Sequence, residues 1–113
     1  MSNLRNSVRL IGNLGAAPEI KTVGNDKKMA KFSMATNETY RNDKGEMVKE
    51  TYWHNVVAWG KTAELAEKFL QKGSEVAIEG KLTSRTFTDK EGNKRYFTEV
   101  LLSELLVFGM KPQ

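Results

Sequence analysis

The sequence predicts an all-β protein, a five-stranded Greek-key barrel with one short helix between its third and fourth strands. Five segments show the two-residue alternation of strands, and a single segment among them has the period of a helix. Helices do not alternate with strands along the chain, which disfavours a parallel α/β sheet. With 113 residues, the chain has the length of one domain, expected over residues 1–113, and can bury a core without covalent cross-links.

The first three expected strands end in a hairpin. Residues 5–14 alternate between apolar and polar side chains, and the glycine and proline of the GAAP that follows are expected to end this strand. Residues 28–37 alternate again and lead to a turn signal, RNDKGE, at 41–46. A strand over 47–59 follows the turn, so these two strands should pair.

A helix and a second hairpin complete the pattern. Residues 61–72 place their apolar side chains on one stripe, as an amphipathic helix does, and Gly73 stands where a C-cap glycine belongs. Residues 75–85 alternate cleanly, DKEGNK at 89–94 is a hairpin loop, and a last strand is expected over 95–108.

Two glycines, Gly12 and Gly80, fall inside expected strands. Glycine in a strand interior suits the sharp bends of a small closed barrel. A five-stranded Greek-key barrel with a helix in this position is an OB-fold, and this is the fold that we expect.

Composition and charge narrow the class of protein. Lys and Arg number 18 against 14 Asp and Glu, which gives a net charge of +4 and a pI near 9.4. This excess favours a polyanion partner, although many enzymes are equally basic. The absence of cysteine excludes disulfides and thiolate metal sites. No apolar run is long enough for a signal peptide or a membrane helix, so we expect a cytoplasmic protein with no membrane partner.

Both tryptophans lie on one expected strand, in the stretch TYWHNVVAWGK. Side chains alternate along a strand, so Trp53 and Trp59 share a face. The indoles are either part of the core, where tryptophan is usually buried, or a surface on which nucleic-acid bases stack. The same face carries Lys49, Thr51 and Asn55, which a core would not readily accept. These polar neighbours favour the stacking surface.

Four blocks of sequence, in this order and spacing, resemble one known family over almost the whole chain. They read RLIGNLGAAPEIK at 9–21, KFSMATNETYR at 31–41, WHNVVAWGKTAELAEKFLQKGSEVAIEGKL at 53–82 and YFTEVLLSEL at 96–105. The family is that of the bacterial single-stranded DNA-binding proteins, which have the OB-fold. The resemblance implies sequence-independent binding and protection of single-stranded DNA in replication, recombination and repair. It also implies a location with the DNA of the nucleoid.

The resemblance also implies site residues. Bases would stack on the aromatic side chains of Tyr40, Trp53, Trp59 and Phe87, and phosphates would contact Lys21, Lys61, Lys72 and Arg85. Their positions on a face or in a loop add three further cations as DNA-binding candidates, namely Lys31, Arg41 and Lys49.

The only histidine, His54, has no partner for chemistry in the sequence. No HxxxH or cysteine pattern supports a metal site, and no paired group supports acid–base catalysis. Its parity on the strand is opposite to that of the tryptophans, which predicts a role in packing or in a subunit contact. The resemblance also places this position near a subunit contact. It implies a homotetramer, with a dimer as the second expectation.

Two other functions remain open. A primosome-type replication protein of the same fold would bind DNA and protein partners as a dimer. A nuclease on this scaffold would need a carboxylate or histidine cluster, and the sequence shows no catalytic constellation, so we expect no enzyme activity, cofactor or metal. The family typically continues into a flexible tail with an acidic tip that recruits other proteins. This sequence ends at VFGMKPQ, as a truncated chain or a tailless variant would, so recruitment through such a tip is not expected.

Overall fold

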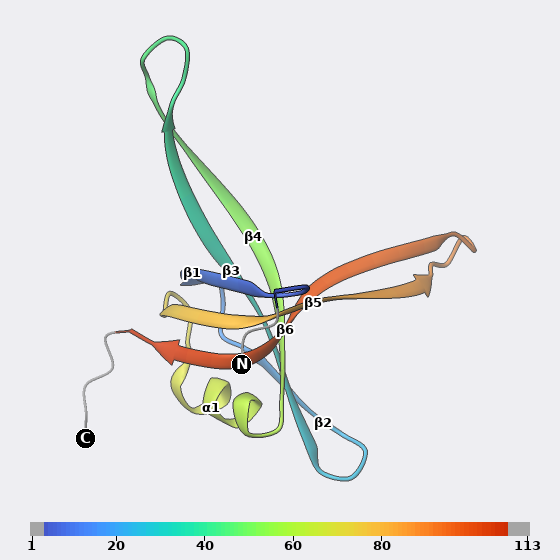
Figure 1. Ribbon diagram of the computed structural model, residues 1–113. Helices are drawn as coiled ribbons and strands as arrows, with labels where there is room; N and C mark the ends of the chain where they lie inside the picture. Colours follow the sequence, from blue (N-terminus) through green and yellow to red (C-terminus); the bar gives the residue numbers. More distant parts are fainter. Residues whose placement is uncertain (1–3, 109–113) are drawn as a thin grey trace.

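The computed structural model describes residues 4–108, so residues 109–113 of the end discussed above lie outside the described residues. Figure 1 shows one helix and a single twisted sheet whose strands curl into a barrel. The elements in chain order are β1 (Val8–Leu14), β2 (Glu19–Val23), β3 (Lys27–Arg41), β4 (Met47–Trp59), α1 (Lys61–Phe69), β5 (Glu75–Thr88) and β6 (Lys94–Val107).

The sheet closes on itself through the first strand. The strand order is β1-β5-β6-β4-β3-β2, and β1 also pairs with β3 at Asn13 and Leu14. β4 and β6 run parallel at Val56 and Val100, whereas the other paired strands are antiparallel. Five strands therefore form the barrel, with α1 between β4 and β5 in the chain, which confirms the predicted all-β barrel.

One strand was missing from the prediction. Residues 19–23 form β2, which pairs with β3 from Glu19 opposite Lys31 to Val23 opposite Lys27. Of these five residues only Ile20 is partly buried, so β2 lacks the apolar alternation by which the other strands are recognised. Pro18 breaks the chain as expected, but pairing with β3 resumes immediately after it.

Several predicted bounds also need correction. β3 runs to residue 41 and β5 to residue 88, beyond the expected ends at 37 and 85. The helix ends at Phe69 and not at residue 72, because Leu70 takes an extended conformation and is buried in the core. Gly73 is therefore not the C-cap. It occupies the following turn with φ of 89°, a left-handed conformation that favours glycine.

The core fills the barrel and is closed at one end by the helix. Met34, Val56 and Val76 are the largest fully buried side chains, and Ala63 and Ala66 of α1 are also fully buried. Alanine lets the helix approach the sheet closely because it adds little volume.

The two strand glycines lie where backbones come close. A Cβ at Gly12 would lie 2.0 Å from the carbonyl oxygen of Ala35, and one at Gly80 would lie 2.2 Å from that of Leu101. A change of register between β5 and β6 also falls between Glu79 and Gly80. Both positions therefore require glycine for barrel closure.

Two long hairpins extend beyond the barrel in different directions, β3–β4 and β5–β6 (Figure 1). The β3–β4 pairing continues in register from Met29 opposite Trp59 to Arg41 opposite Met47. These arms carry large side chains that the core does not cover, and they position the site described next.

Candidate nucleic-acid interface

The register of β3 and β4 places both tryptophans on one surface, which we name the Trp face. Its members are Met29, Lys31, Ser33, Ala35, Asn37, Thr39 and Arg41 of β3, and Met47, Lys49, Thr51, Trp53, Asn55, Val57 and Trp59 of β4. Trp53 is 60% exposed and Trp59 39% exposed, whereas Val56 and Ala58 between them face the core. The indoles are therefore not part of the core.

Charge on the Trp face has one sign. Lys31, Arg41 and Lys49 lie on it, and none of its members is acidic. On the neighbouring strand β2, Lys21 stands opposite Met29, which in turn stands opposite Trp59, and adds a cation, whereas Glu19 stands opposite Lys31 and adds a carboxylate. Two exposed indoles thus lie among four cations on one side of the hairpin.

The ring of Trp53 rests against the backbone that follows β1. A Cβ at Gly15 would lie 2.6 Å from Cζ3 of Trp53, so the indole occupies the space that a side chain would take. The amide of Gly15 donates a hydrogen bond to the carbonyl of Ser33, at 3.1 Å, which fixes this segment against β3. One side of the ring is thus supported, while much of the ring remains exposed.

A groove of about 340 Å³ continues from the Trp face toward β6. Lys31, Ser33, Asn55 and Val57 line it from the Trp face, and further lining comes from the β1–β2 connection and β2, and from Phe97 and Glu99 of β6. Neither of these two β6 residues was predicted from the sequence as a site residue.

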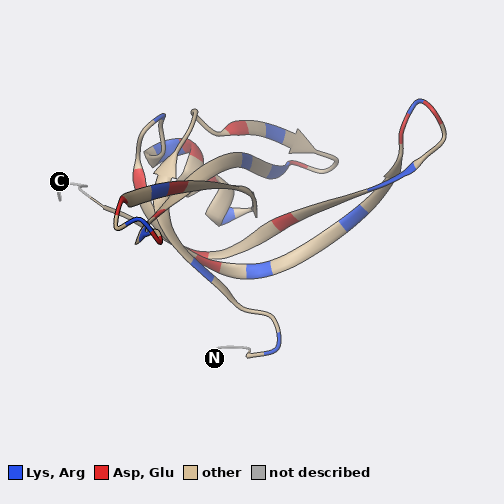
Figure 2. Cartoon of the chain, turned by 90° about the horizontal axis from the view of Figure 1, so that it is seen from above, with Lys and Arg blue, Asp and Glu red and all other residues tan. Residues whose placement is uncertain are grey.

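The β5–β6 arm carries a second cluster. Arg85 stands opposite Phe97, and Phe87 stands opposite Arg95, so all four side chains share one face of the arm. The guanidinium carbon of Arg85 lies 5.6 Å from the centre of the Phe97 ring, and Phe87 is 52% exposed. Figure 2 shows basic bands on both strands of this arm and acidic residues in the loop at its tip.

Comparison with known proteins decides the family. The model of the single-strand binding protein family matches residues 5–108.

The chain belongs to this family.

Relatives and a solved structure agree with this assignment. Single-stranded DNA-binding protein 1 of Xylella fastidiosa is 45% identical over 107 residues, which cover 94% of this chain and 79% of that protein. Its namesake in Chlorobaculum tepidum is 38% identical over 107 residues, which cover 94% of this chain and 66% of that protein. The structure of Plasmodium falciparum SSB in complex with single-stranded DNA matches with a TM-score of 0.85 and 33% identity, over 91% of this chain and 94% of that one. The predicted resemblance and the OB-fold are both confirmed, and proteins of this family are DNA-binding proteins without enzyme activity.

One stacking residue implied by the resemblance to single-strand binding proteins lies apart from the tryptophans. Tyr40 has the opposite parity in β3, on a surface that we name the Tyr face, whose members are Thr36, Glu38, Tyr40, Val48, Glu50, Tyr52 and His54. The Tyr40 hydroxyl donates a 3.0 Å hydrogen bond to the Glu50 carboxylate, and the Tyr52 hydroxyl donates another. The hydrogen bond from Tyr52, and then that from Tyr40, lower the pKa of Glu50. Each bond also raises the pKa of the phenol that donates it.

The remaining candidate cations flank the helix. Lys61 is the first residue of α1 and follows Trp59 by two positions. Lys72 precedes Gly73, whose amide donates a hydrogen bond to the carbonyl of Leu14, next to Gly15. The backbone next to Lys72 is therefore hydrogen-bonded to the segment that supports Trp53. Neither Lys61 nor Lys72 lines the groove.

His54 lies on the Tyr face, as its parity predicted. Its Nε2 is 2.9 Å from the hydroxyl oxygen of Thr36, on the opposite strand, and the side chain is partly buried. Within residues 4–108 there is no group of three or more His, Cys, Asp or Glu side chains that could hold a metal ion. A role for His54 in a subunit contact remains a prediction.

Proposed function

We propose that this protein binds single-stranded DNA with little sequence preference and shields it during replication, recombination and repair. The Trp face carries the proposal, because it combines two exposed indoles with cations and has no carboxylate. Bases of any kind have a π-face that can stack on an indole, and the cations can meet the phosphates. The solved complex of the Plasmodium falciparum relative with single-stranded DNA supports the same ligand.

The positions of the side chains support the following contacts with the strand. Trp53 and Trp59 stack bases, and Lys21, Lys31, Arg41 and Lys49 meet the phosphates beside them. Phe87 and Arg85 extend the path along the β5–β6 arm, with Tyr40, Lys61 and Lys72 as outlying contacts. No bond is made or broken, so binding depends on stacking and on the release of counterions from the strand.

A fluorescence titration tests the function. Poly(dT) added to the protein should quench tryptophan emission, because the bases stack on the indoles, and added salt should weaken the binding. A labelled oligonucleotide incubated with the protein and Mg²⁺ should stay intact, which separates binding from nuclease activity. Unchanged emission, together with no binding of the labelled oligonucleotide, would refute the proposal.

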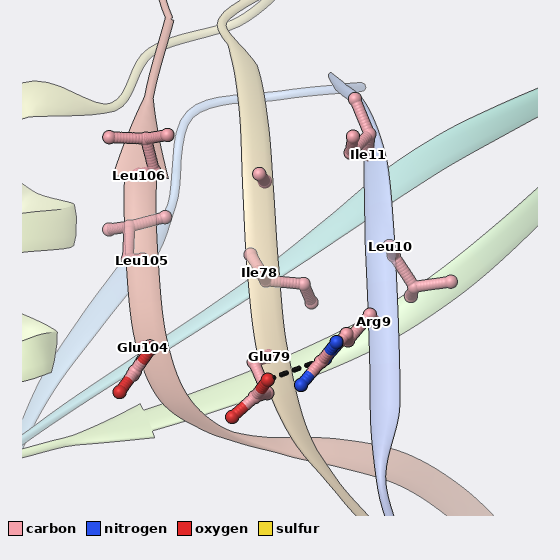
Figure 3. Close-up of a pocket in the computed structure, with 9 residues that line it drawn as sticks. Arg9, Leu10, Ile11, Ile78, Glu79, Glu104, Leu105 and Leu106 are labelled. Carbon is pink, nitrogen blue, oxygen red and sulfur yellow. Dashed lines mark hydrogen bonds and ion pairs between the residues drawn. The ribbon is translucent and has the colours of Figure 1, made fainter. Parts of the chain in front are cut away.

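We further propose that the protein assembles as a homotetramer, with a dimer second. Between Val8 and Gly12, β1 pairs with β5 on one side only, so its other edge is available to a second chain. Figure 3 shows apolar side chains of three neighbouring strands beside the Arg9–Glu79 ion pair. Ile11 is 61% exposed and Leu106 is 59% exposed, as is typical of a surface that a partner covers.

Sedimentation equilibrium at micromolar concentration tests the assembly. A tetramer would give one strand several Trp faces to follow, whereas a monomer would refute the assembly. A stable dimer would instead favour the primosome-type replication protein. The same experiment with a His54→Ala variant tests the subunit role of this histidine, because loss of an interface contact should shift the equilibrium toward smaller species.

Domain organisation and location complete the proposal. We propose that residues 1–113 form a single OB-fold domain. A cytoplasmic location with the nucleoid DNA suits a protein that binds single-stranded DNA. Among residues 4–108, no helix is long and apolar enough to span a membrane. Expression of a fluorescent fusion should show whether the protein follows the nucleoid, and a diffuse distribution would count against that location.

A further inference from the structure

Glu99 is a buried carboxylate beside the Trp face. It is 8% exposed and is the only charged residue that is buried among residues 4–108. It stands on β6 two residues after Phe97, and both line the groove, as do Ser33 and Asn55. A carboxylate at this place is unexpected if the groove serves phosphates, because like charges repel each other more strongly away from bulk water.

Arg85 satisfies only part of this carboxylate. Its Nε lies 3.2 Å from Oε1 of Glu99, and its Nη2 lies 3.3 Å from Oε2. The guanidinium thus pairs with both carboxylate oxygens, but at long distances. An ionised carboxylate offers about four lone-pair sites, and the guanidinium engages two of them. Glu99 therefore keeps acceptor capacity toward a ligand in the groove.

The other groups around the groove also suit the edge of a base. Ser33 and Asn55 stand opposite each other in the β3–β4 register, and within residues 4–108 their side chains make no hydrogen bond with the protein. Phe97 offers a ring beside them, and Lys31 offers a cation. Glu19 of β2 also lines the groove, but it is exposed and stands opposite Lys31, so Glu99 is the buried carboxylate of the lining. A volume of about 340 Å³ falls within the usual range for small-ligand sites, about 300–1,000 Å³.

We propose that this groove receives one nucleobase and that Glu99 accepts a hydrogen bond from its exocyclic amino group. Cytosine, adenine and guanine carry such a group, whereas thymine presents a carbonyl oxygen at the position that corresponds to the cytosine amine. Glu99 thus favours amino-bearing bases over thymine at one point of a path that otherwise tolerates any sequence. This inference rests on the proposed function, because it assumes that a single strand follows the Trp face.

A comparison of two pyrimidine oligomers tests the role of Glu99. Oligomers of dC and dT of equal length are titrated against wild-type protein and the Glu99→Gln variant, in enough salt for both affinities to be measurable. The ratio of Kd for dC to Kd for dT should rise about tenfold in Glu99→Gln, as expected for loss of one hydrogen bond to a charged group. Release of Arg85 in this variant changes both affinities alike and cancels in the ratio.

A matched variant and a modified ligand complete the design. Glu67→Gln removes a carboxylate that is also ion-paired, at 2.6 Å from Lys28 Nζ, but lies on the helix, so its ratio should equal that of the wild type. An oligomer of N4,N4-dimethyl-dC lacks the amino hydrogens. It should bind wild-type protein about tenfold more weakly than dC does, and Glu99→Gln should reduce that difference.

The outcomes separate the two proposals. The inference stands if the Kd ratio changes in Glu99→Gln alone and the dimethylated oligomer loses affinity through Glu99. It is overturned if Glu99→Gln leaves the ratio unchanged, or if dC and its dimethylated form bind wild-type protein equally. Should Glu99→Gln fail to fold, the dimethylated oligomer decides alone. If wild-type emission responds to neither dC nor dT, the proposed function itself fails.

Discussion

The two faces of the β3–β4 hairpin carry aromatic side chains in opposite electrostatic surroundings. On the Trp face, two exposed indoles lie among cations. On the Tyr face, two half-exposed phenols donate hydrogen bonds to one carboxylate, Glu50, and Glu38 stands directly opposite that carboxylate. A single strand carries a negative charge at each phosphate, so we expect the Trp face to attract it more strongly than the Tyr face does. Exposure of a ring therefore does not by itself identify a stacking surface.

The largest effect should come from removing an indole. Trp53→Ala should weaken binding of poly(dT) by about 1–3 kcal/mol, roughly 5–150-fold, because one stacked base loses its partner. Tyr40→Ala should cost less affinity, since its surroundings repel the phosphates. Both affinities are measured by titration at one salt concentration, with Trp59 reporting in the Trp53→Ala variant. An equal loss in the two variants would show that both faces bind DNA.

A core variant controls for folding. Met34 is fully buried and faces away from the indoles, so Met34→Ala should cost about 2–5 kcal/mol of unfolding free energy. While it remains folded, it should bind poly(dT) with nearly wild-type affinity. Urea denaturation of Trp53→Ala should show only a modest loss, because an exposed ring leaves no cavity.

A smaller loss of affinity should follow from displacing the Trp53 ring from its contact with the Gly15 backbone. Gly15→Ala places a methyl group 2.6 Å from Cζ3 of Trp53, which is too close for two carbon atoms, so the ring must shift. Because the tip of the ring can move, the fold should survive, and affinity should fall by less than in Trp53→Ala. Tryptophan emission of the free protein should change as well. Wild-type emission and affinity in this variant would show that the contact does not orient the indole.

Alternation along one strand made the Trp face predictable from the sequence. The parity of Trp53 against Val56 is a local property of β4, and the small apolar residues between the indoles indicated which face enters the barrel. Phe97 and Glu99 were not predictable in this way, because their position beside Arg85 depends on the pairing of β5 with β6. That pairing changes register between Glu79 and Gly80, which no local pattern specifies.

The same distinction explains the errors in the fold. β2 is exposed almost throughout and is specified by its pairing with β3, so its own residues carry no periodic signal. The face of Tyr40 was likewise not predictable. Tyr40 was assigned from its place at the tip of the first hairpin and from the resemblance, and its position relative to the tryptophans depends on the register of β3 with β4.

Two lysines of β3 lie on opposite faces and should differ in their contact with DNA. Lys31 lies on the Trp face, whereas Lys28 has the opposite parity and pairs with Glu67 of the helix at 2.6 Å. Lys31→Ala should reduce the magnitude of the slope of log K against log salt by up to about 0.7, the value for one phosphate on a single strand. Lys28→Ala should leave the slope unchanged. Equal slopes in both variants would mean that Lys31 does not meet the strand.

The smallest effect should come from the carboxylate of the Tyr face. Hydrogen bonds from Tyr52 and Tyr40 lower the pKa of Glu50 below its ordinary value of 4.5. The folded protein therefore holds fewer protons at this site than the unfolded chain, so the contribution to stability is complete above about pH 4.5 and is lost as the pH falls through the folded pKa. Glu50→Gln removes this contribution, so the difference in melting temperature between wild type and variant should narrow between neutral pH and about pH 3. Because Glu50→Gln also removes a negative charge, its affinity for poly(dT) at neutral pH should stay equal or rise slightly. A fall comparable to that of Trp53→Ala would instead mean that Glu50 holds the Tyr40 and Tyr52 rings for bases, and that the strand contacts both faces of the hairpin.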